Sequence, residues 1–279
     1  MEIWAVLNVT PDSFSDGGQY LALDAAIARA KRMLREGADV IDVGGVSSRP
    51  RGATYGAGAE DVSVDVERAR VLPVVEVIAR ELGARVSIDT TRGEVAEAAL
   101  RAGARIVNDV SMGRDATLLA AAAAHDAELV LMHTRGRGEI TAENTRYDDV
   151  LREVSVELQL ACERALAVGV RRLWIDPGLG FAKTAAQSAL LLAHTGELLR
   201  LGAKVLVGAS RKSFLGVLAE REGVRPGPDA RLPASLVAAT IAARAGAHAL
   251  RVHDVAETRQ ALDVLDAIDG AAAREGDDA

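Results

Sequence analysis

Short apolar segments alternate with longer amphipathic segments along almost the whole chain. The short segments are rich in Val, Ile and Leu, which is typical of the strands of a buried parallel sheet, and the long ones repeat apolar residues at helical spacing. This pattern predicts eight strand–helix units. The predicted strands are Trp4–Leu7, Val40–Val43, Val86–Ile88, Ile106–Val107, Leu129–Met132, Leu173–Ile175, Val205–Val207 and Leu250–Val252.

Helices are predicted between and after these strands, and most end in a glycine. The predicted helices are Leu21–Arg35, Val64–Leu82, Glu94–Arg101, Ala116–His125, Tyr147–Ala167, Ala186–Leu201, Pro233–Arg244 and Ala256–Ile268. A glycine past a helix end takes the left-handed conformation without a Cβ clash and turns the chain into the next strand. The glycines in this position are Gly37, Gly83, Gly103, Gly169, Gly202 and Gly246. Asp126 stands in the same place before the fifth strand.

Eight such units with right-handed crossovers close most economically into a single-domain α/β fold, the (β/α)8 TIM barrel. An open parallel sheet would leave two edges to be covered. We expect the barrel to occupy residues 1–270 and the small, acidic segment 271–279 to be a disordered tail.

Composition limits the partners of this chain of 279 residues. Its net charge of −7 and pI near 5.4 disfavour nucleic acid or an anionic membrane as the main partner. The single Cys162 excludes an intrachain disulfide and fits a reducing compartment. The chain begins without a basic and apolar leader, and none of its apolar runs approaches about 18 residues. We therefore expect a cytoplasmic protein.

Polar residues lie at or just after the carboxyl end of every predicted strand. In a TIM barrel the functional site lies at this end, so we expect these side chains to converge on one rim. Helix capping explains a single such residue well, but it does not explain a full ring. The residues are Asn8, Asp42, Asp89, Asn108, His133, Asp176, Ser210, Arg211, Lys212, Arg251 and His253.

The rim combines two kinds of chemistry. Asp42, Asp89, Asp176 and Asn108 offer hydrogen-bond acceptors and an amide, whereas Arg49, Lys212, Arg251 and His253 offer donors or cations. Carboxylates suit the edge of an amidine-like heterocycle, and Arg and Lys suit phosphate oxygens. The sequence therefore predicts a ligand with a flat, nitrogen-rich head and a diphosphate tail.

Two further interpretations concern the loops. Lys183 and Thr184 follow the Asp-Pro-Gly loop that starts at Asp176, and they either cap the next helix or contact phosphate, with capping the simpler role for both. His133 and Arg135 either join the site or tie down the fifth loop. The segment Glu220–Arg231 is expected to be a surface excursion.

An ordered set of motifs resembles the dihydropteroate synthase family from Leu7 to about Ile268. Each motif alone is weak, but their order and spacing together are specific. The motifs are LNVTPDSFSDGG from Leu7, DVGGVSSRP from Asp42, SIDT from Ser87, VNDV from Val107, LMHTRG from Leu131, DPGLGFAK from Asp176, GASRKSFLG from Gly208 and RVHDV from Arg251.

The resemblance implies condensation of 6-hydroxymethyl-7,8-dihydropterin pyrophosphate with p-aminobenzoate, giving 7,8-dihydropteroate and pyrophosphate. It also implies Mg²⁺ held by Asn8, a homodimer and sensitivity of the family to sulfonamides. The implied catalytic residues are Asp89, Asp176, Lys212, Asp16 and Arg49. The implied substrate-binding residues are Asn108, Asp42, Met132, Phe181, Gly208, Phe14, Ser48, Pro50, Ser213, Arg251 and His253.

The second loop departs from the family pattern. Where the family usually has Gly-Gly-Glu-Ser-Thr-Arg-Pro-Gly, this chain reads Gly-Gly-Val-Ser-Ser-Arg-Pro-Arg-Gly from Gly44, with Val46 and Arg51 as the differences that change chemistry. Alternative functions are a catalytically impaired pterin-binding paralogue and a pterin-dependent corrinoid methyltransferase. A metal-dependent aldolase is a further alternative, which would require a metal-ligand cluster or a Schiff-base lysine.

Overall fold

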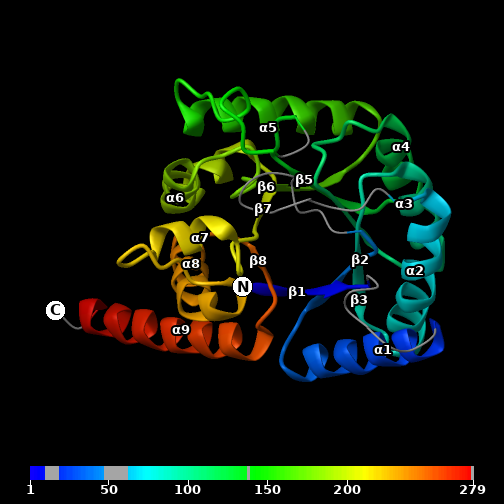
Figure 1. Cartoon of the computed structure of the whole chain (residues 1–279), viewed down its shortest axis with the longest axis horizontal. Helices are drawn as coiled ribbons and strands as arrows, with labels where there is room; N and C mark the ends of the chain where they lie inside the picture. Colours follow the sequence, from blue (N-terminus) through cyan, green and yellow to red (C-terminus); the bar gives the residue numbers. More distant parts are fainter. Residues whose placement is uncertain (10–18, 47–61, 137–138, 278–279) are drawn as a thin grey trace.

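A closed barrel of parallel strands, in the order β1 to β8, forms the centre of the computed structural model (Figure 1). The structure describes residues 1–9, 19–46, 62–136 and 139–277. The strands are β1 (Glu2–Asn8), β2 (Val40–Gly44), β3 (Arg85–Asp89), β4 (Ile106–Asp109), β5 (Glu128–Met132), β6 (Arg172–Asp176), β7 (Lys204–Val207) and β8 (Ala249–Val252). The TIM-barrel prediction is confirmed, and each strand extends the predicted apolar run by at most two residues at either end.

Helices surround the barrel in sequence order (Figure 1). They are α1 (Gln19–Arg35), α2 (Val64–Glu76), α3 (Gly93–Ala102), α4 (Ala116–Ala124), α5 (Val150–Ala167), α6 (Ala185–Ala193), α7 (Ser213–Leu218), α8 (Leu232–Arg244) and α9 (Val255–Asp277). The segment η2 (Val77–Glu81) continues α2 as a π-helix, while η3 (Thr195–Leu201) and η4 (Pro228–Arg231) are 3-10 helices. The predicted helix Ala186–Leu201 is therefore broken at His194, and α7 is too short for periodicity to reveal it.

The predicted turn residues adopt the left-handed conformation. Gly37 has φ of 99° and Gly103 has φ of 125°, and the other glycines named above are also positive. Asp126, which replaces glycine in the fifth unit, has φ of 48°. Asp is among the few residues with a side chain that tolerate this region. The fifth unit therefore keeps the left-handed turn of the other units although it lacks the glycine.

The inside of the barrel contains a small apolar cluster that supports the rim. Trp4 and Trp174 pack edge to face with ring centroids 5.0 Å apart. The other members of the cluster are Val40, Ile106, Val130, Leu206 and Ala249. Because side chains two residues apart on a strand point the same way, Asp42, Asn108, Met132, Asp176, Gly208 and Arg251 face inward directly above this cluster.

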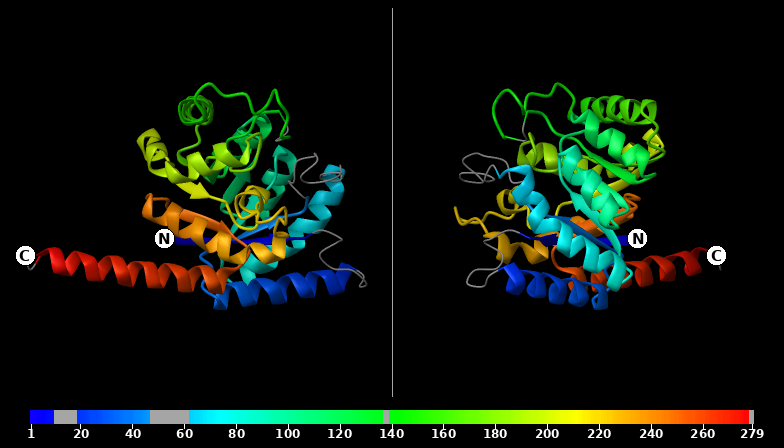
Figure 2. Two further views of the ribbon diagram at one scale, coloured as in Figure 1. Left: turned by 60° about the vertical axis from the view of Figure 1, so that its left-hand side comes forward. Right: turned by 90° about the vertical axis from the view of Figure 1, so that its right-hand side faces the viewer.

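The last helix extends well past the barrel. Figure 2 shows α9 projecting from the body of the protein towards the C-terminus. This helix runs through Asp277 and so includes most of the segment 271–279, for which the sequence predicts a disordered tail. Alanines and good helix formers in this segment favour continuation of the helix. No helix in the described ranges is long and apolar enough to cross a membrane.

Candidate active site

Arg251 joins two buried carboxylates across the mouth of the barrel. Its Nε donates to Asp42 Oδ2 at 2.6 Å and its Nη2 donates to Asp89 Oδ2 at 2.7 Å. Asn108 Nδ2 also donates to Asp42 Oδ2, at 3.2 Å. Residues from β2, β3, β4 and β8 therefore meet in one network, as predicted from their positions at the strand ends.

A second group gathers around Gly208, at the end of β7. A Cβ atom built on Gly208 would lie 3.5 Å from Asp176 Oδ2, 3.8 Å from Lys212 Nζ and 3.7 Å from Arg251 Cβ. Lys212 Nζ lies 4.9 Å from the centroid of the Phe181 ring, within the range of a cation–π contact. The absence of a side chain at Gly208 thus leaves the space into which a ligand can approach both charged groups.

Met132 contributes an apolar neighbour to this group. It is paired in register with Asp176 on the adjacent strand and is buried. Met132 therefore lies beside Asp176 and Phe181 lies beside Lys212, so both provide apolar surface near the charged groups. Ser213 is buried at the first residue of α7, immediately after Lys212.

Asn8 lies beside Asp89 at the end of β1. A Cβ atom on Gly44 would lie 3.7 Å from both Asn8 Oδ1 and Asp89 Oδ2, so these two oxygens face the same small space. Within the described ranges the structure contains no cluster of three His, Cys, Asp or Glu side chains that could hold a metal ion. An amide oxygen with one neighbouring carboxylate nevertheless fits Mg²⁺ that takes most of its ligands from phosphates and water.

Burial shifts the proton equilibria of the rim. Burial raises the pKa of Asp89 to about 7, although Arg251 opposes the shift. Burial likewise raises the pKa of Asp176, against the effect of Lys212, and it lowers the pKa of Lys212 to about 8, against the effect of Asp176. Burial also lowers the pKa of Arg251, but Asp42 and Asp89 outweigh it and the net shift is upward. The carboxylates are thus poorly hydrated and would gain from a ligand that donates hydrogen bonds or carries positive charge.

His253 follows β8 and contacts the loop after β7. Ser210 Oγ lies 3.2 Å from the backbone N and 3.0 Å from Nδ1 of His253. Arg211 binds the carboxylate of Asp254 through Nε, at 3.0 Å, and through Nη2. These contacts hold the loop after β7, which carries Lys212, to the loop after β8, which carries His253.

Lys183 does not cap α6, contrary to the prediction. Thr184 and Gln187 form the capping box of that helix, whereas Lys183 is completely buried. Its Nζ lies 2.8 Å from His133 Nδ1, 3.1 Å from the Gly178 carbonyl oxygen and 3.0 Å from the Phe181 carbonyl oxygen. The lysine fills the inside of the Asp-Pro-Gly loop and holds its shape, a role that the sequence alone does not reveal.

His133 and Arg135 tie down the fifth loop, which was one of their two predicted alternatives. His133 Nε2 lies 3.0 Å from Glu157 Oε2 on α5. Arg135 binds Glu153 and Glu157, and its guanidinium lies 3.8 Å from the centroid of the Tyr147 ring. All of these contacts are internal to the β5–β6 side of the barrel.

Two polar residues near the rim, Glu67 and Ser87, were not predicted from the sequence. Glu67 on α2 accepts hydrogen bonds from Thr90 Oγ1 at 2.7 Å and from Arg92 Nη1 at 3.0 Å, just after Asp89. Ser87 Oγ and Asp42 Oδ1 are buried without a partner among the described residues, and the two residues are paired in register. Strand alternation could have indicated Ser87, but nothing in the helical pattern of α2 distinguishes Glu67.

Five of the predicted site residues lie outside the residues that the structure describes. They are Phe14, Asp16, Ser48, Arg49 and Pro50. All belong to the loops after β1 and β2.

Comparison with known proteins identifies relatives over nearly the whole chain. A family model described as "Pterin binding enzyme" matches residues 4–253. The dihydropteroate synthase of Mycobacterium leprae is 46% identical, with 96% of this chain and 93% of the relative covered. That of Escherichia coli K12 is 42% identical, with 95% of this chain and 90% of the relative covered.

Solved structures agree with these relatives. The dihydropteroate synthase of Xanthomonas albilineans with 4-aminobenzoic acid superposes with a TM-score of 0.86 at 42% identity, covering 96% of this chain and 93% of that one. The enzyme of Yersinia pestis in complex with a sulfonamide drug gives a TM-score of 0.85 at 39% identity, covering 96% and 94%.

Proposed function

Because the chain belongs to the dihydropteroate synthases of the pterin-binding enzyme family, we propose that it condenses 6-hydroxymethyl-7,8-dihydropterin pyrophosphate with p-aminobenzoate. The products are 7,8-dihydropteroate and pyrophosphate. The observation that carries the proposal is the convergence of Asp89, Asn108, Asp176, Lys212 and Arg251 at one end of the barrel. The relatives reported above do not favour the corrinoid methyltransferase.

The pterin ring binds at the buried carboxylates. Asp176 and Asp89 accept hydrogen bonds from the ring nitrogens, and Asn108 and Lys212 complete the edge recognition. The unpartnered Asp42 Oδ1 supports this assignment, since a buried carboxylate oxygen without a donor costs free energy that a ligand N–H would recover. Phe181 and Met132 provide apolar contacts, and Gly208 allows the ring to approach the charged groups.

The diphosphate binds between the ends of β1 and β8. Nη1 of Arg251 has no partner in the described part of the chain, and the same is true of Nε2 of His253, so both atoms are open to phosphate oxygens. Mg²⁺ bound at Asn8 would draw negative charge from the leaving diphosphate. Asn8 Oδ1 and Asp89 Oδ2 fit that ion because both oxygens face the same small space beside Gly44.

The reaction needs electrostatic stabilisation more than a strong base. When the C–O bond ionises, negative charge grows on the diphosphate near Arg251 and Lys212, and positive charge spreads from the exocyclic methylene into the pterin ring. Asp89 and Asp176 stabilise that cation. The weakly basic arylamine then has to be positioned rather than deprotonated, which is the role we assign to the loop residues Phe14, Asp16, Ser48, Arg49 and Pro50, and to Ser213.

A homodimer is also part of the proposal. Helices α6, α7 and α8 border an apolar groove of about 300 Å³, lined by Leu192, Leu215 and Ile241 among others. Leu218 and Val237 at this groove are 54% and 59% exposed, so they extend its apolar surface to solvent as one contiguous patch. A second copy of the chain would cover them, and Val237→Glu would then shift the sedimentation coefficient from dimer to monomer.

We further propose that residues 1–270 form the catalytic unit and that the protein acts in the cytoplasm. Both assignments are consistent with the single barrel and with the absence of a membrane-spanning helix in the described ranges.

One assay tests the proposed reaction. Purified protein is incubated with the pterin pyrophosphate and Mg²⁺, and pyrophosphate release is followed with and without p-aminobenzoate. Release that depends on the amine and yields dihydropteroate is expected. Saturable pterin binding without amine-dependent release would overturn the proposal in favour of the impaired paralogue, which the changes at Val46 and Arg51 make the strongest alternative.

A further inference from the structure

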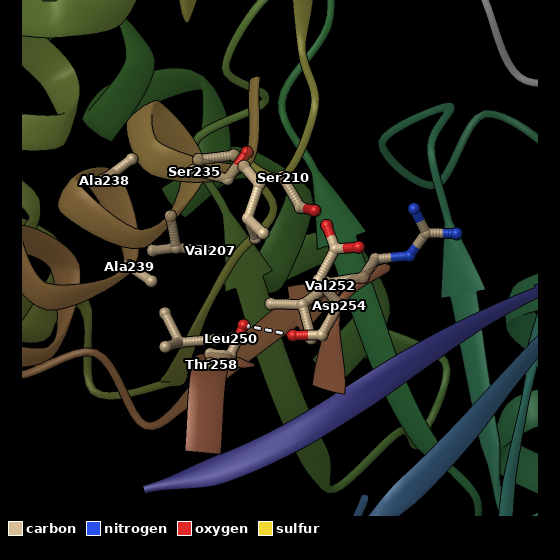
Figure 3. Close-up of a pocket in the computed structure, with 12 residues that line it drawn as sticks. Val207, Ser210, Ser235, Ala238, Ala239, Leu250, Val252, Asp254 and Thr258 are labelled. Carbon is tan, nitrogen blue, oxygen red and sulfur yellow. Dashed lines mark hydrogen bonds between the residues drawn. The ribbon is translucent and has the colours of Figure 1, made fainter. Parts of the chain in front are cut away.

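Ser210 lies where the loops after β7 and β8 meet. Figure 3 shows it beside a small cavity of about 10 Å³ together with Ser235, Asp254 and Thr258. Its side chain points to the following loop and makes both of its hydrogen bonds with His253, one to the backbone N and one to Nδ1. Ser210 is only 9% exposed, so water does not compete freely for its hydroxyl group.

A count of donors and acceptors determines the direction of the second hydrogen bond. The backbone N–H of His253 can only donate, so Ser210 Oγ accepts there. If Nδ1 also carried a hydrogen, the Ser210 hydroxyl hydrogen would have no acceptor among the described residues. With Nδ1 unprotonated, Ser210 O–H donates to Nδ1 and every group in the contact is satisfied. The hydrogen of the neutral ring then resides on Nε2.

The contact is held in place from several directions. Arg211 has a left-handed backbone with φ of 59°, its N–H donates to Ser235 Oγ at 3.0 Å, and its carbonyl oxygen accepts from Arg231 Nη1 at 2.9 Å. Its side chain binds Asp254, the residue after His253. A strained residue with this many partners fixes the position of Ser210 relative to His253.

The surroundings of His253 keep its ring neutral. Burial lowers the pKa of His253 to about 3, and Arg251, Arg211 and Arg29 act in the same direction, whereas Asp254 opposes them. Near pH 7 the ring therefore has one hydrogen, and the position of that hydrogen decides whether Nε2 donates or accepts. A neutral acceptor at Nε2 would repel a phosphate oxygen.

We propose that Ser210 is a positioning residue that holds His253 in the tautomer with hydrogen on Nε2, so that Nε2–H donates to an oxygen of the substrate diphosphate. The identity of that anion rests on the proposed function. The tautomer itself does not, because it follows from the contacts of Ser210 within the free protein.

The tautomer can be read directly by NMR. In protein labelled with ¹⁵N-histidine at pH 7, long-range ¹H–¹⁵N correlation distinguishes the protonated from the unprotonated ring nitrogen, and His253→Asn assigns the signals. We expect His253 to be protonated at Nε2 in the wild type, and Ser210→Ala to shift the population towards protonation at Nδ1. Thr258→Val removes a hydroxyl group from the same cavity, one that donates to the Asp254 carbonyl oxygen four residues earlier, and should leave the pattern unchanged. Protonation at Nδ1 in the wild type would overturn the proposal.

Anion binding provides the second readout. In Ser210→Ala the His253 ring no longer keeps its hydrogen on Nε2, so one hydrogen bond to the charged anion is lost. The affinity for inorganic pyrophosphate, measured by calorimetry, should therefore fall about tenfold. Ser210→Thr keeps the hydroxyl group and should restore both the tautomer and the affinity. Equal affinity of wild type and Ser210→Ala would contradict the proposal. If the tautomer is as expected but the wild type catalyses no condensation, the proposed function fails and the positioning role stands.

Discussion

His133 and His253 follow strands of the same barrel, at the same end, and both are neutral near pH 7, yet their surroundings differ. Both ring nitrogens of His133 are occupied, one by Lys183 and one by Glu157. His253 uses only Nδ1, on Ser210, and its Nε2 has no partner in the part of the chain that the structure describes. The β5–β6 side of the mouth is therefore saturated, whereas the β7–β8 side keeps a donor for a ligand.

The difference separates residues that hold the site from residues that use it. On the saturated side, Lys183, His133 and Glu157 satisfy one another and the carbonyl oxygens of the Asp-Pro-Gly loop. Substitutions of these three residues should therefore lower the free energy of unfolding. On the open side, Arg251 Nη1 and His253 Nε2 have no protein partner among the described residues, so substitutions there should act on ligand binding and on the reaction rate.

The largest stability effect is expected for Lys183→Met. The substitution leaves His133 Nδ1 and the Phe181 carbonyl oxygen without a donor among the described residues, and it leaves the Gly178 carbonyl oxygen with the backbone N–H of Phe181 alone. It should lower the free energy of unfolding by about 3–5 kcal/mol. Urea denaturation measures the change.

Lys204→Met is the matched control for this lysine. Lys204 lies at the surface over Trp174, at 4.7 Å from the ring centroid, and its replacement should cost about 1 kcal/mol or less. An equal loss of unfolding free energy in Lys183→Met and Lys204→Met would contradict the view that the polar groups on the β5–β6 side satisfy one another.

The pH dependence of stability should reveal His133. Burial and Lys183 lower the pKa of His133 to about 4, below its ordinary value in the unfolded chain. The unfolded state therefore binds the proton first, so this contribution is fully present above pH 6.5 and is lost as the pH falls towards 4. Between pH 7 and pH 4 the loss should be about 3 kcal/mol.

His133→Gln isolates that contribution from the other titrating groups. Its unfolding free energy should depend less steeply on pH between 7 and 4 than that of the wild type. Parallel curves for the two proteins would show that His133 is not held neutral by its neighbours.

On the open side, His253→Asn should reduce kcat/KM for the pterin pyrophosphate about 100-fold, because one donor to the developing charge is lost. The free energy of unfolding should change by less than about 1 kcal/mol, since only the Ser210 contact is affected. Steady-state kinetics and urea denaturation of the same preparation measure both. A variant that is destabilised but fully active would reverse the assignment of the two sides.

The smallest effect is expected at the start of α6. Thr184→Ala removes the side chain that accepts from Gln187 N at 3.2 Å, and it should lower stability by about 1 kcal/mol with little change in kcat/KM. Substitution of the neighbouring Lys183 should cost several times more. Similar costs for the two neighbours would contradict the interpretation that Lys183, and not Thr184, supports the loop.

Much of the fold could be predicted from the sequence because each βα unit is locally encoded. The apolar run predicts the strand, the glycine predicts the helix end, and Asp126 could replace glycine without loss of the turn. Helix breaks were missed, because the pattern of Ala186–Leu201 continues smoothly through His194. The short α7 has too few turns to produce a period.

The site could be predicted as far as strand ends determine it. Asp42, Asp89, Asn108, Asp176 and Arg251 converge because parallel strands end on one rim. The roles of Lys183 and Ser210 could not be predicted, since they depend on which loop folds over which. A lysine after Asp-Pro-Gly has the same local sequence whether it caps a helix or lies buried beneath the loop.

The central claim is that the buried carboxylates above the barrel core carry the chemistry, and Asp89→Asn tests it most directly. Asp109→Asn is the control, because Asp109 is also buried at the next strand end but accepts, among the described residues, from Ser111 N and Gly113 N of its own loop. The account predicts that amine-dependent pyrophosphate release by Asp89→Asn falls by about 100-fold or more in kcat/KM, while Asp109→Asn loses stability and keeps most of its activity. Full activity of correctly folded Asp89→Asn would contradict it.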